Sequence, residues 1–362
     1  MRPAEQTAFI VESARALGLD LCGVAPADDY SELARLPEWL SRGCAGEMHY
    51  LADPRRGSPS SAMPGARSII VCALNYNTDH PYSTEVAAHA ESDRGWISRY
   101  AWGEDYHLVL GKKLDALLDK MHAQFGESFD ARAYVDTGPI VERVAAKHAG
   151  LGWLGKNTCL IHEQLGSWFF VGVILTTLDL APSLGPADSP PADLCGNCTL
   201  CLDACPTGVL TEPYTMDARL CISYLTIELR GPVPEHLRKP MGRHVFGCDI
   251  CQDVCPWNRR APVSPAAEFQ PRQIGSRTLV APELEWLAGL AESDFQRIFR
   301  KGAVKRAKWQ GLVRNACIAL GNSVPQPGTP AQDRVAGILK RLAALPDPVV
   351  AESVQWALSR IQ

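Results

Sequence analysis

The chain is predicted to fold into several domains of the mixed α/β or α+β class, because three kinds of sequence follow one another along its 362 residues. Strand-like and helix-like segments alternate through the first half, two cysteine-rich runs come next, and the remainder is helical in pattern. A chain of this length can bury two or three separate cores. We therefore expect an α/β domain over residues 1–185, a cysteine-rich domain over 186–265 and a helical domain over 266–362.

The elements of the first domain follow from hydrophobic periodicity and from the glycines that punctuate it. Its helices are amphipathic, and two of them stop at Gly126 and Gly150. Its strands are short apolar runs, such as SIIVCAL, of the length expected for buried strands. The helices are predicted at residues 5–17, 105–125 and 140–149, and the strands at 68–74, 131–135 and 168–177.

The second domain carries two cysteine runs that each end in Cys-Pro. The first run has the spacing C-x2-C-x2-C-x3-C-P of bacterial ferredoxins, in which three thiolates bind one [4Fe-4S] cluster and the fourth binds a second cluster. The second run lacks its first cysteine, because Val245 stands there, and Cys221 is the nearby spare thiol. This ferredoxin-like domain is thus expected to hold two clusters with crossed ligands, namely Cys195, Cys198, Cys201 and Cys255, and Cys205, Cys221, Cys248 and Cys251.

Structural zinc and disulfides are the alternatives for these cysteines. Zinc sites favour CxxC pairs separated by a longer loop, which the closely spaced first run does not resemble. Disulfides need an oxidising compartment, and the first ten residues, MRPAEQTAFI, lack the basic start and apolar stretch of a signal peptide. We expect a cytosolic protein whose other cysteines pack as small apolar residues, namely Cys22, Cys44, Cys72, Cys159 and Cys317.

The third domain is expected to be all-helical. Proline-rich segments at 181–193 and 261–272 separate the cysteine-rich domain from its neighbours. Beyond them, apolar residues recur at helical spacing over 309–320, and a second helix is predicted to begin at Asp347-Pro348. The segments RNACIALGN and ESVQWALSRI, about forty residues apart, resemble one another as successive HEAT-type repeats do.

Overall composition excludes some partners. A net charge of −4 gives no general reason to expect a polyanion. The longest unbroken apolar run, residues 168–175, is about half as long as a membrane span requires. We therefore expect no membrane partner, and any surface that binds nucleic acid must be local.

One segment of the third domain is strongly basic. Residues 295–332 contain no acidic side chain, whereas Lys301, Lys305, Arg306 and Lys308 lie close together within them. Because a solvated helix face normally mixes both signs, the segment is either a phosphate-binding surface or an incidental one. Trp309, among these charges, could stack on a base or belong to the core.

The first domain is the expected place for a redox cofactor, because clusters deliver electrons one at a time and need an acceptor beside them. The segment 105–111, DYHLVLG, is close to the DxHxxG sequence by which some proteins bind cobalamin through a histidine. It has one residue too many and opens a helix, so we interpret His107 as a helix-face residue rather than a metal ligand.

Asp136 is the sharpest catalytic candidate in this domain. It follows the predicted strand at 131–135 and precedes Thr137-Gly138-Pro139. Catalytic groups often lie where a strand ends, because the backbone is rigid and the tip is open. The alternative is that Asp136 caps the next helix.

Four motifs of the chain, together with the cysteine runs, resemble the epoxyqueuosine reductase family. The resemblance spans nearly the whole chain, and it reproduces both the position of Cys221 and the incomplete second run. The motifs are YVDTGP at 134–139, GLGWLGKNT at 150–158, GSWFF at 166–170 and RLCISYLTIE at 219–228.

The resemblance implies a cobalamin-dependent enzyme with two [4Fe-4S] clusters that reduces epoxyqueuosine to queuosine at the wobble position of tRNA. It implies an external electron donor, and we expect a monomer that contacts tRNA through its basic helical segment. Asp136 matches the carboxylic acid that donates a proton to the departing oxygen, a role that burial beside the macrocycle would favour by raising its pKa. By resemblance, the cobalamin contacts are Arg56, Tyr100, Asn157, Ser167 and Trp168.

Two other functions fit parts of the pattern. Reductive dehalogenases share the cobalamin and double-cluster plan, but they are expected to carry an export signal. A ferredoxin-like electron carrier would need the clusters alone, and the 1–185 domain would then have no purpose.

Overall fold

A computed structural model describes residues 1–89, 93–323 and 328–361. Its central element is a four-stranded sheet in the order β1 (Leu21–Pro26), β2 (Ser68–Asn75), β7 (Phe169–Thr176) and β4 (Ala131–Tyr134). Every neighbouring pair in this sheet is antiparallel. Of the two fold classes expected, the sheet is therefore of the α+β kind, and the assignment of the first domain to the α/β class was wrong.

The position of β7 explains this difference. Strands β2 and β4 run in the same direction and are connected through helix α5 (Tyr106–Phe125), as the alternating pattern predicts. Strand β7 then enters between them in the opposite direction, and β1 pairs with the other edge of β2. The sequence pattern shows that strands and helices alternate, but it does not show where the last strand inserts.

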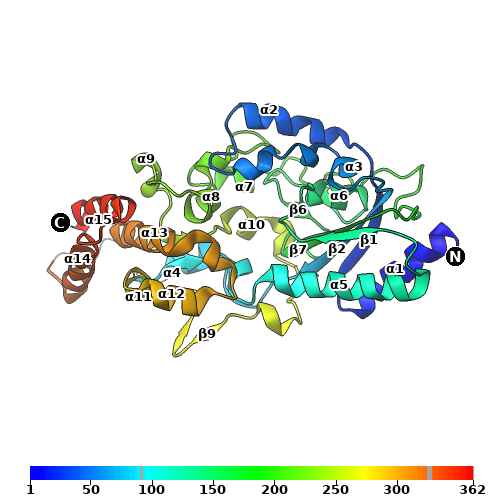
Figure 1. Ribbon diagram of the computed structural model, residues 1–362. Coiled ribbons are helices and arrows are strands. Elements are labelled where there is room, and N and C mark those ends of the chain that lie inside the picture. The colour runs from blue at the N-terminus through cyan, green and yellow to red at the C-terminus, as the bar shows by residue number, and fades with distance from the viewer. Residues whose placement is uncertain (90–92, 324–327, 362) are drawn as a thin grey trace.

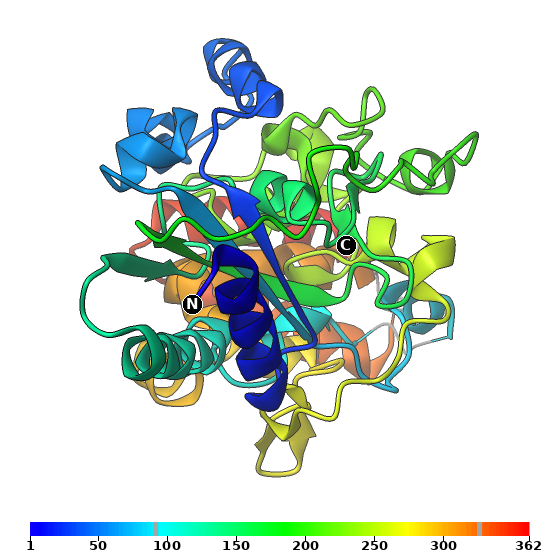
Figure 2. The same cartoon turned by 90° about the vertical axis from the view of Figure 1, so that its right-hand side faces the viewer.

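Helices cover both faces of this sheet (Figures 1 and 2). Helices α1 (Pro3–Ala16) and α5 pack against one face in a common apolar core, and α6 (Glu142–His148) and α3 (Pro59–Ala62) cover the other. The predicted helices and strands of this part are confirmed; β1 was not predicted. The remaining elements are short, namely α2 (Arg35–Ser41), α4 (Ser83–His89), β3 (Trp96–Ile97), β5 (Trp153–Leu154) and β6 (Leu160–Ile161).

The cysteine-rich part consists of short elements packed beside the sheet. Its strand β8 (His244–Phe246) pairs in parallel with β3, which ties it to the first part of the chain. Two of its helices, each containing a predicted cluster ligand, contact one another, α7 (Leu200–Asp203) and α10 (Ile250–Asp253). The other helices are α8 (Ile222–Ile227) and α9 (Glu235–Arg238).

The last part is mainly helical and lies at the opposite end of the molecule from the N-terminus (Figure 1). Both predicted helices are confirmed, as α13 (Lys308–Ser323) and α15 (Pro348–Ile361), and they pack against one another. The HEAT-type relationship stays a prediction. The elements that were not predicted are β9 (Gln273–Ile274), β10 (Arg277–Thr278), α11 (Leu284–Ala288), α12 (Glu292–Phe299) and α14 (Pro330–Leu342).

The helical part shares its apolar core with the rest of the chain. Trp96, Trp102 and Phe246 belong to the same buried cluster as the inner faces of α11 to α15. This apolar core therefore includes residues from both sides of the predicted domain boundary at residue 265. The division into three domains stays a prediction. Among the described helices, none combines the length and apolarity needed to cross a membrane.

Candidate active site

Asp136 lies in a tight turn directly after β4. Its φ is 59°, in the left-handed region that few residues other than glycine adopt, and the Thr137 N–H donates to the Val135 carbonyl across it at 2.6 Å. Such strained positions cluster at functional sites. The N-cap of α6 is Val141, without a side-chain cap, so the alternative in which Asp136 caps this helix was wrong.

The Asp136 carboxylate is held from one side only. Its Oδ2 accepts a hydrogen bond from the Tyr106 hydroxyl at 2.7 Å, and His107 Nε2 lies 3.8 Å from the same oxygen. Its side chain is 67% exposed, so the expected burial beside a macrocycle has to come from the bound ligand and stays a prediction. The other oxygen, Oδ1, has no hydrogen-bond partner among the described residues, which leaves it available to a bound substrate.

A layer of aromatic side chains packs behind Tyr106, which donates to Asp136. The Tyr106 ring stacks on Phe170 of β7, with centroids 4.3 Å apart and planes at 4°, and Phe170 lies 4.4 Å from Tyr76. Tyr100, a predicted cobalamin contact, meets Tyr106 edge to face at 6.1 Å and is half-buried. Burial and the negative charge of Asp136 raise the pKa of Tyr106, so its hydroxyl stays protonated and donates.

A buried carboxylate fixes His107 beside Asp136. Asp105, the N-cap of α5, bonds to His107 Nδ1 at 2.8 Å and accepts from Lys305 Nζ at 2.6 Å. Burial alone would raise the pKa of Asp105, but the hydrogen bonds from His107 and Lys305 outweigh it and hold the pKa well below its usual value. His107 is thus a site residue that sequence reasoning placed on an ordinary helix face.

A second carboxyl, Glu142, lies on the other side of Asp136. The residue is half-buried, yet its Oε1 is shielded from solvent and lacks a hydrogen-bond partner within the described part of the chain. Burial, with a further contribution from Asp136, raises the pKa of Glu142 to about 7. Arg143, the next residue, donates to the Thr158 carbonyl and not to Glu142.

This pKa predicts how stability depends on pH. Unfolded, Glu142 would ionise near its ordinary pKa of 4.5, so the folded protein binds the extra proton and loses stability as pH rises from about 4.5 to about 7. Glu142→Gln cannot ionise, and its melting temperature relative to wild type should therefore be higher at pH 8 than at pH 5, by on the order of 2 °C. Thermal unfolding at both pH values measures this difference. The exposed Glu163→Gln serves as the matched control, and an equal offset at both pH values for Glu142→Gln would contradict the prediction.

Two basic side chains, Arg306 and Arg56, lie near the acidic groups of the site. Arg306 forms a two-pronged ion pair with Glu228, at 2.9 and 2.8 Å, and its guanidinium lies 5.7 Å from the Tyr50 ring centroid. Arg56, another predicted cobalamin contact, is 9% exposed and donates to the Ile140 carbonyl at 3.1 Å. We call Asp136, Glu142, Arg306 and Arg56 the rim of the site. The rim therefore carries both positive and negative side chains near the aromatic layer.

The other predicted cobalamin contacts are core residues. Trp168 is 0% exposed and packs against Tyr76 and Tyr82 inside the main core, and a side chain with no accessible surface has none to offer a ligand. Asn157 and Ser167 are at most 5% exposed, and their polar groups bond to Cys251 and Asn258. In the protein itself these three side chains position their neighbours, and their contact with cobalamin stays a prediction.

The predicted tRNA-binding cations divide into two pairs. Lys301 and Lys308 are exposed, whereas Lys305 and Arg306 are held in the ion pairs with Asp105 and Glu228. Trp309 donates from Nε1 to the Leu290 carbonyl at 2.7 Å and packs on the apolar core, which supports the core interpretation. Residues 324–327 of the acid-free segment lie outside the described residues.

The eight predicted cluster cysteines fall into two groups. The pKa of Cys201 is raised to about 11 by burial and by the neighbouring Cys255, Cys195 and Cys198. Burial and the neighbouring Cys221 and Cys205 raise the pKa of Cys248. The pKa of Cys251 is raised first by its hydrogen bond to Cys159, a thiol outside both sets, then by burial and by Cys248 and Cys221. Apart from Cys159, the neighbours lie within one set. These neighbours match the crossed ligand sets, and the assignment of each cysteine to a cluster stays a prediction.

The donor set suits four-iron clusters. A [4Fe-4S] cluster takes one thiolate on each iron, so its ligands surround a cube instead of converging on a point. Within the described residues, no three His, Cys, Asp or Glu side chains converge on a single metal ion. Two groups of four thiols fit two such clusters.

Helix α13 holds the backbone around two of these ligands. Arg314, fully buried, donates to the carbonyls of Leu229 and Gly231 at 2.8 and 2.7 Å, and Asn315 donates to those of Thr226 and Val245 at 2.9 Å each. These carbonyls belong to the segments that follow Cys221 and precede Cys248. Arg314 is therefore a structural residue, although it lies in the basic segment.

A polar chain connects the cysteines to the aromatic layer. Gln252, next to Cys251, donates to Ser167 Oγ at 2.9 Å and reaches the Tyr76 hydroxyl at 3.5 Å. Tyr76 in turn lies against Phe170, on which Tyr106 stacks. The second cysteine group and Asp136 thus lie at the two ends of one packed network.

An exposed acid, connected through a packed network to a cysteine-rich region, indicates the class of iron–sulfur oxidoreductases. Residues 194–258 match the family model for a 4Fe-4S double cluster binding domain, and residues 56–137 match that described as epoxyqueuosine reductase QueG, DUF1730. The epoxyqueuosine reductase of Gloeobacter violaceus is 45% identical over 88% of this chain and 97% of its own length. The chain belongs to the epoxyqueuosine reductase family.

Solved structures agree with this assignment. An epoxyqueuosine reductase crystallised with an epoxyqueuosine-modified tRNA-Tyr stem loop has a TM-score of 0.84 at 30% identity, over 99% of this chain and 90% of that one. The Bacillus subtilis epoxyqueuosine reductase, described with its catalytic aspartate loop swung out of the active site, has a TM-score of 0.83 at 29% identity, with the same coverage.

Proposed function

We propose that the protein reduces epoxyqueuosine at the wobble position of tRNA to queuosine, with Asp136 as the proton donor. The observation that carries the proposal is the strained, exposed Asp136, held by Tyr106 at the end of the network that begins at Cys251. The stem-loop complex of a relative supports the tRNA substrate, and the swung-out aspartate loop of the Bacillus subtilis relative supports a catalytic role for such a turn. Family membership favours this function over a dehalogenase or a simple electron carrier.

Two cofactor types follow from this function. The thiol groups would hold two [4Fe-4S] clusters that accept single electrons from an external donor. The rim, with side chains of both charges, and the aromatic layer fit a large flat macrocycle with polar arms. Bound cobalamin would supply a strongly reducing cobalt centre. Tyr100 and Arg56 are the groups that would meet it.

The protein's own part in the reaction is to place a proton. Removing the epoxide oxygen as water takes two electrons and two protons. Because Tyr106 donates to Oδ2 of Asp136, the transferable proton belongs on Oδ1, which faces solvent. Lys305 fixes Asp105, Asp105 fixes the His107 ring, and His107 Nε2 limits how far Asp136 can turn.

The direct test is product formation. Reconstituted protein, a strong reductant and tRNA containing epoxyqueuosine should yield queuosine nucleoside on digestion, and omission of cobalamin should abolish the product. Unchanged product without cobalamin would remove the corrin from the proposal. Absence of product under every condition would remove the reductase function.

The tRNA surface has its own test. If Lys301 and Lys308 contact phosphates, the double variant Lys301→Gln, Lys308→Gln should bind tRNA more weakly and lower the slope of log affinity against log salt by about 1 to 2. Lys305 and Arg306 are left in place, because their ion pairs support the site. Titrations at several salt concentrations measure the slope. The control is Lys120→Gln on α5, and an unchanged slope in the double variant would place the RNA surface elsewhere.

A further inference from the structure

Two cysteines outside the cluster ligand sets face one another across the edge of the sheet. Cys22 on β1 is directly opposite Cys72 on β2, and their Sγ atoms lie 3.8 Å apart. Cys72 is fully buried, whereas Cys22 is partly exposed. The pair belongs neither to the candidate active site nor to the thiol groups proposed to bind clusters.

The backbone register brings these thiols close. In an antiparallel pair, opposite residues alternate between hydrogen-bonded and non-hydrogen-bonded positions, and side chains approach most closely at the latter. Ala27 donates to its opposite residue Arg67, so Cys22, five positions back, falls at a non-hydrogen-bonded position. Val24, two positions from Cys22, should therefore also be a non-hydrogen-bonded position. Its N–H and its carbonyl both bond to Ser183, on the side away from β2, as this pattern requires.

This geometry suits a covalent link. The Cα atoms of a non-hydrogen-bonded pair are about 4.5 Å apart, within the range of about 4.4–6.8 Å seen in disulfides. The sulfurs would need to close from 3.8 Å to about 2 Å, which side-chain rotation can supply.

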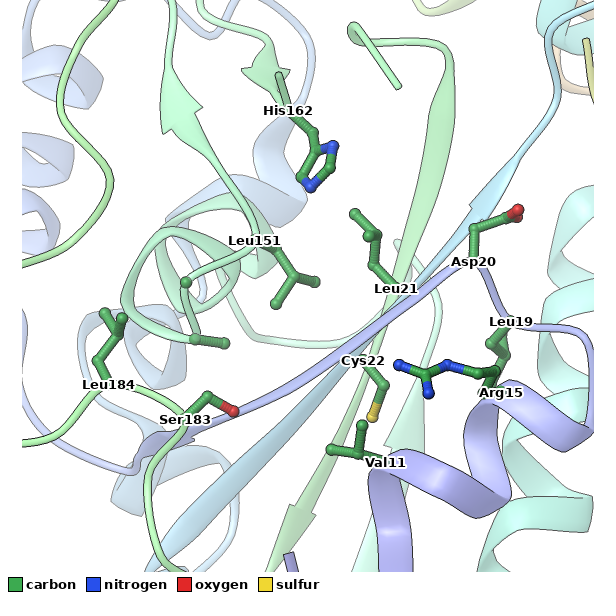
Figure 3. A pocket seen from close by; sticks show the side chains of 12 residues that line it. Val11, Arg15, Leu19, Asp20, Leu21, Cys22, Leu151, His162, Ser183 and Leu184 are labelled. Carbon is green, nitrogen blue, oxygen red and sulfur yellow. The ribbon is translucent and has the colours of Figure 1, made fainter. Parts of the chain in front are cut away.

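A cavity gives a small reagent access to one of the two sulfurs. It has a volume of about 290 Å³ and is lined by Cys22 together with Arg15, Asp20 and His162. Figure 3 shows the Arg15 guanidinium pointing toward Cys22 across this space. The cavity therefore leads a small reagent to Cys22, whereas Cys72 is closed off from solvent.

The two thiols have different roles. Cys72 donates its S–H to Cys22 Sγ, and this hydrogen bond together with burial raises the pKa of Cys72. Cys22, unlike Cys72, is partly exposed and lines the cavity. Cys22 is therefore the thiol that reacts with a reagent from the cavity, and Cys72 is the thiol that follows.

We propose that Cys22 and Cys72 form a reversible peroxide-oxidisable dithiol. The Cys22 thiolate attacks one oxygen of hydrogen peroxide, the O–O bond breaks, and the departing hydroxide takes up the thiol's proton as water, which leaves Cys22 as sulfenic acid. The Cys72 sulfur then attacks the Cys22 sulfur, the S–O bond breaks, and a second water leaves with the Cys72 proton. One peroxide is reduced to two waters, and two thiols are oxidised to one disulfide.

Peptide mapping tests this proposal on the cluster-loaded protein. The anaerobic protein receives one equivalent of hydrogen peroxide, free thiols are alkylated, and tryptic digests are analysed without reduction. Cys22 and Cys72 are the single cysteines of tryptic peptides 16–35 and 68–94. The expected product is these two peptides joined, lighter by two hydrogens than their sum and separated by dithiothreitol.

Variants assign the order of the steps. In Cys72→Ser, Cys22 should be trapped as sulfenic acid by dimedone; in Cys22→Ser, Cys72 should stay reduced and the linked peptide should be absent. If both thiols of the wild-type protein remain fully alkylatable while cluster cysteines are oxidised, the proposal is overturned. The wild-type mapping decides the question even if a variant does not fold.

Discussion

Asp136→Asn should slow the formation of queuosine by roughly 10²- to 10⁴-fold, the usual contribution of a positioned general acid. Asparagine has nearly the same shape and can still accept the Tyr106 hydrogen bond, but it has no acidic proton to give. It also tolerates a φ of 59° better than most residues, so the turn itself should survive. Single-turnover rates on tRNA containing epoxyqueuosine measure the effect.

The controls for Asp136→Asn separate chemistry from folding. Iron content, cobalamin binding and tRNA affinity should match wild type, as should the turnover of Asp119→Asn, a substitution at an exposed position of α5. Wild-type turnover in Asp136→Asn would refute the proposed acid. Loss of cobalamin or of folded protein would instead make Asp136 a structural residue of its turn.

Cys221→Ala should remove or convert one of the two clusters and lower the iron content from about eight to about four atoms per chain. The reason is that Val245 occupies the position of the missing ligand in the second run. The buried Cys221 thiol lies near Cys205, which raises its pKa, and near Cys248, whose pKa it raises. Iron analysis and electron paramagnetic resonance of the reduced protein measure the loss. Turnover should fall to the level of protein without clusters.

Cys44→Ala is the matched control for this experiment. Cys44 is a buried thiol whose carbonyl accepts a hydrogen bond from Ala218, three residues before Cys221, so it is a thiol outside the ligand sets close to the substituted position. Its iron content should be that of wild type. Two intact four-iron clusters in Cys221→Ala, or loss of iron in Cys44→Ala, would defeat the crossed ligand assignment.

The position of Asp136 could be predicted because it depends on local sequence. A short strand followed by Thr-Gly-Pro places an acid at a strand end, and the structure confirms this position after β4. The groups around it could not be predicted in the same way. Tyr106 and His107 directly follow the helix cap Asp105. Lys305 lies 200 positions further along the chain than Asp105, so only folding brings these two side chains together. The helix cap at Asp105, beside a tyrosine and a histidine, was the available signal.

The burial of some predicted cofactor contacts has a physical cause. Trp168 begins the longest apolar run of the sequence, and such a run predicts a buried strand more directly than a ligand contact. The basic segment was similarly misleading, because a count of charges omits their partners. Glu228 and Asp105 neutralise Arg306 and Lys305 from distant parts of the chain, and Arg314 is buried among carbonyls.

The carbonyl contacts of Arg314 and Asn315 bear on how the protein matures as it leaves the ribosome. Every cysteine of the second ligand set is synthesised before α13, yet the peptide groups beside Cys221 and Cys248 are held by side chains that α13 supplies. The nascent chain therefore exposes its thiols before their surroundings are built. If these thiols bind a cluster, we expect delivery of iron and sulfide to this half of the protein to wait for the C-terminal helices, which makes cluster insertion a late step of biogenesis.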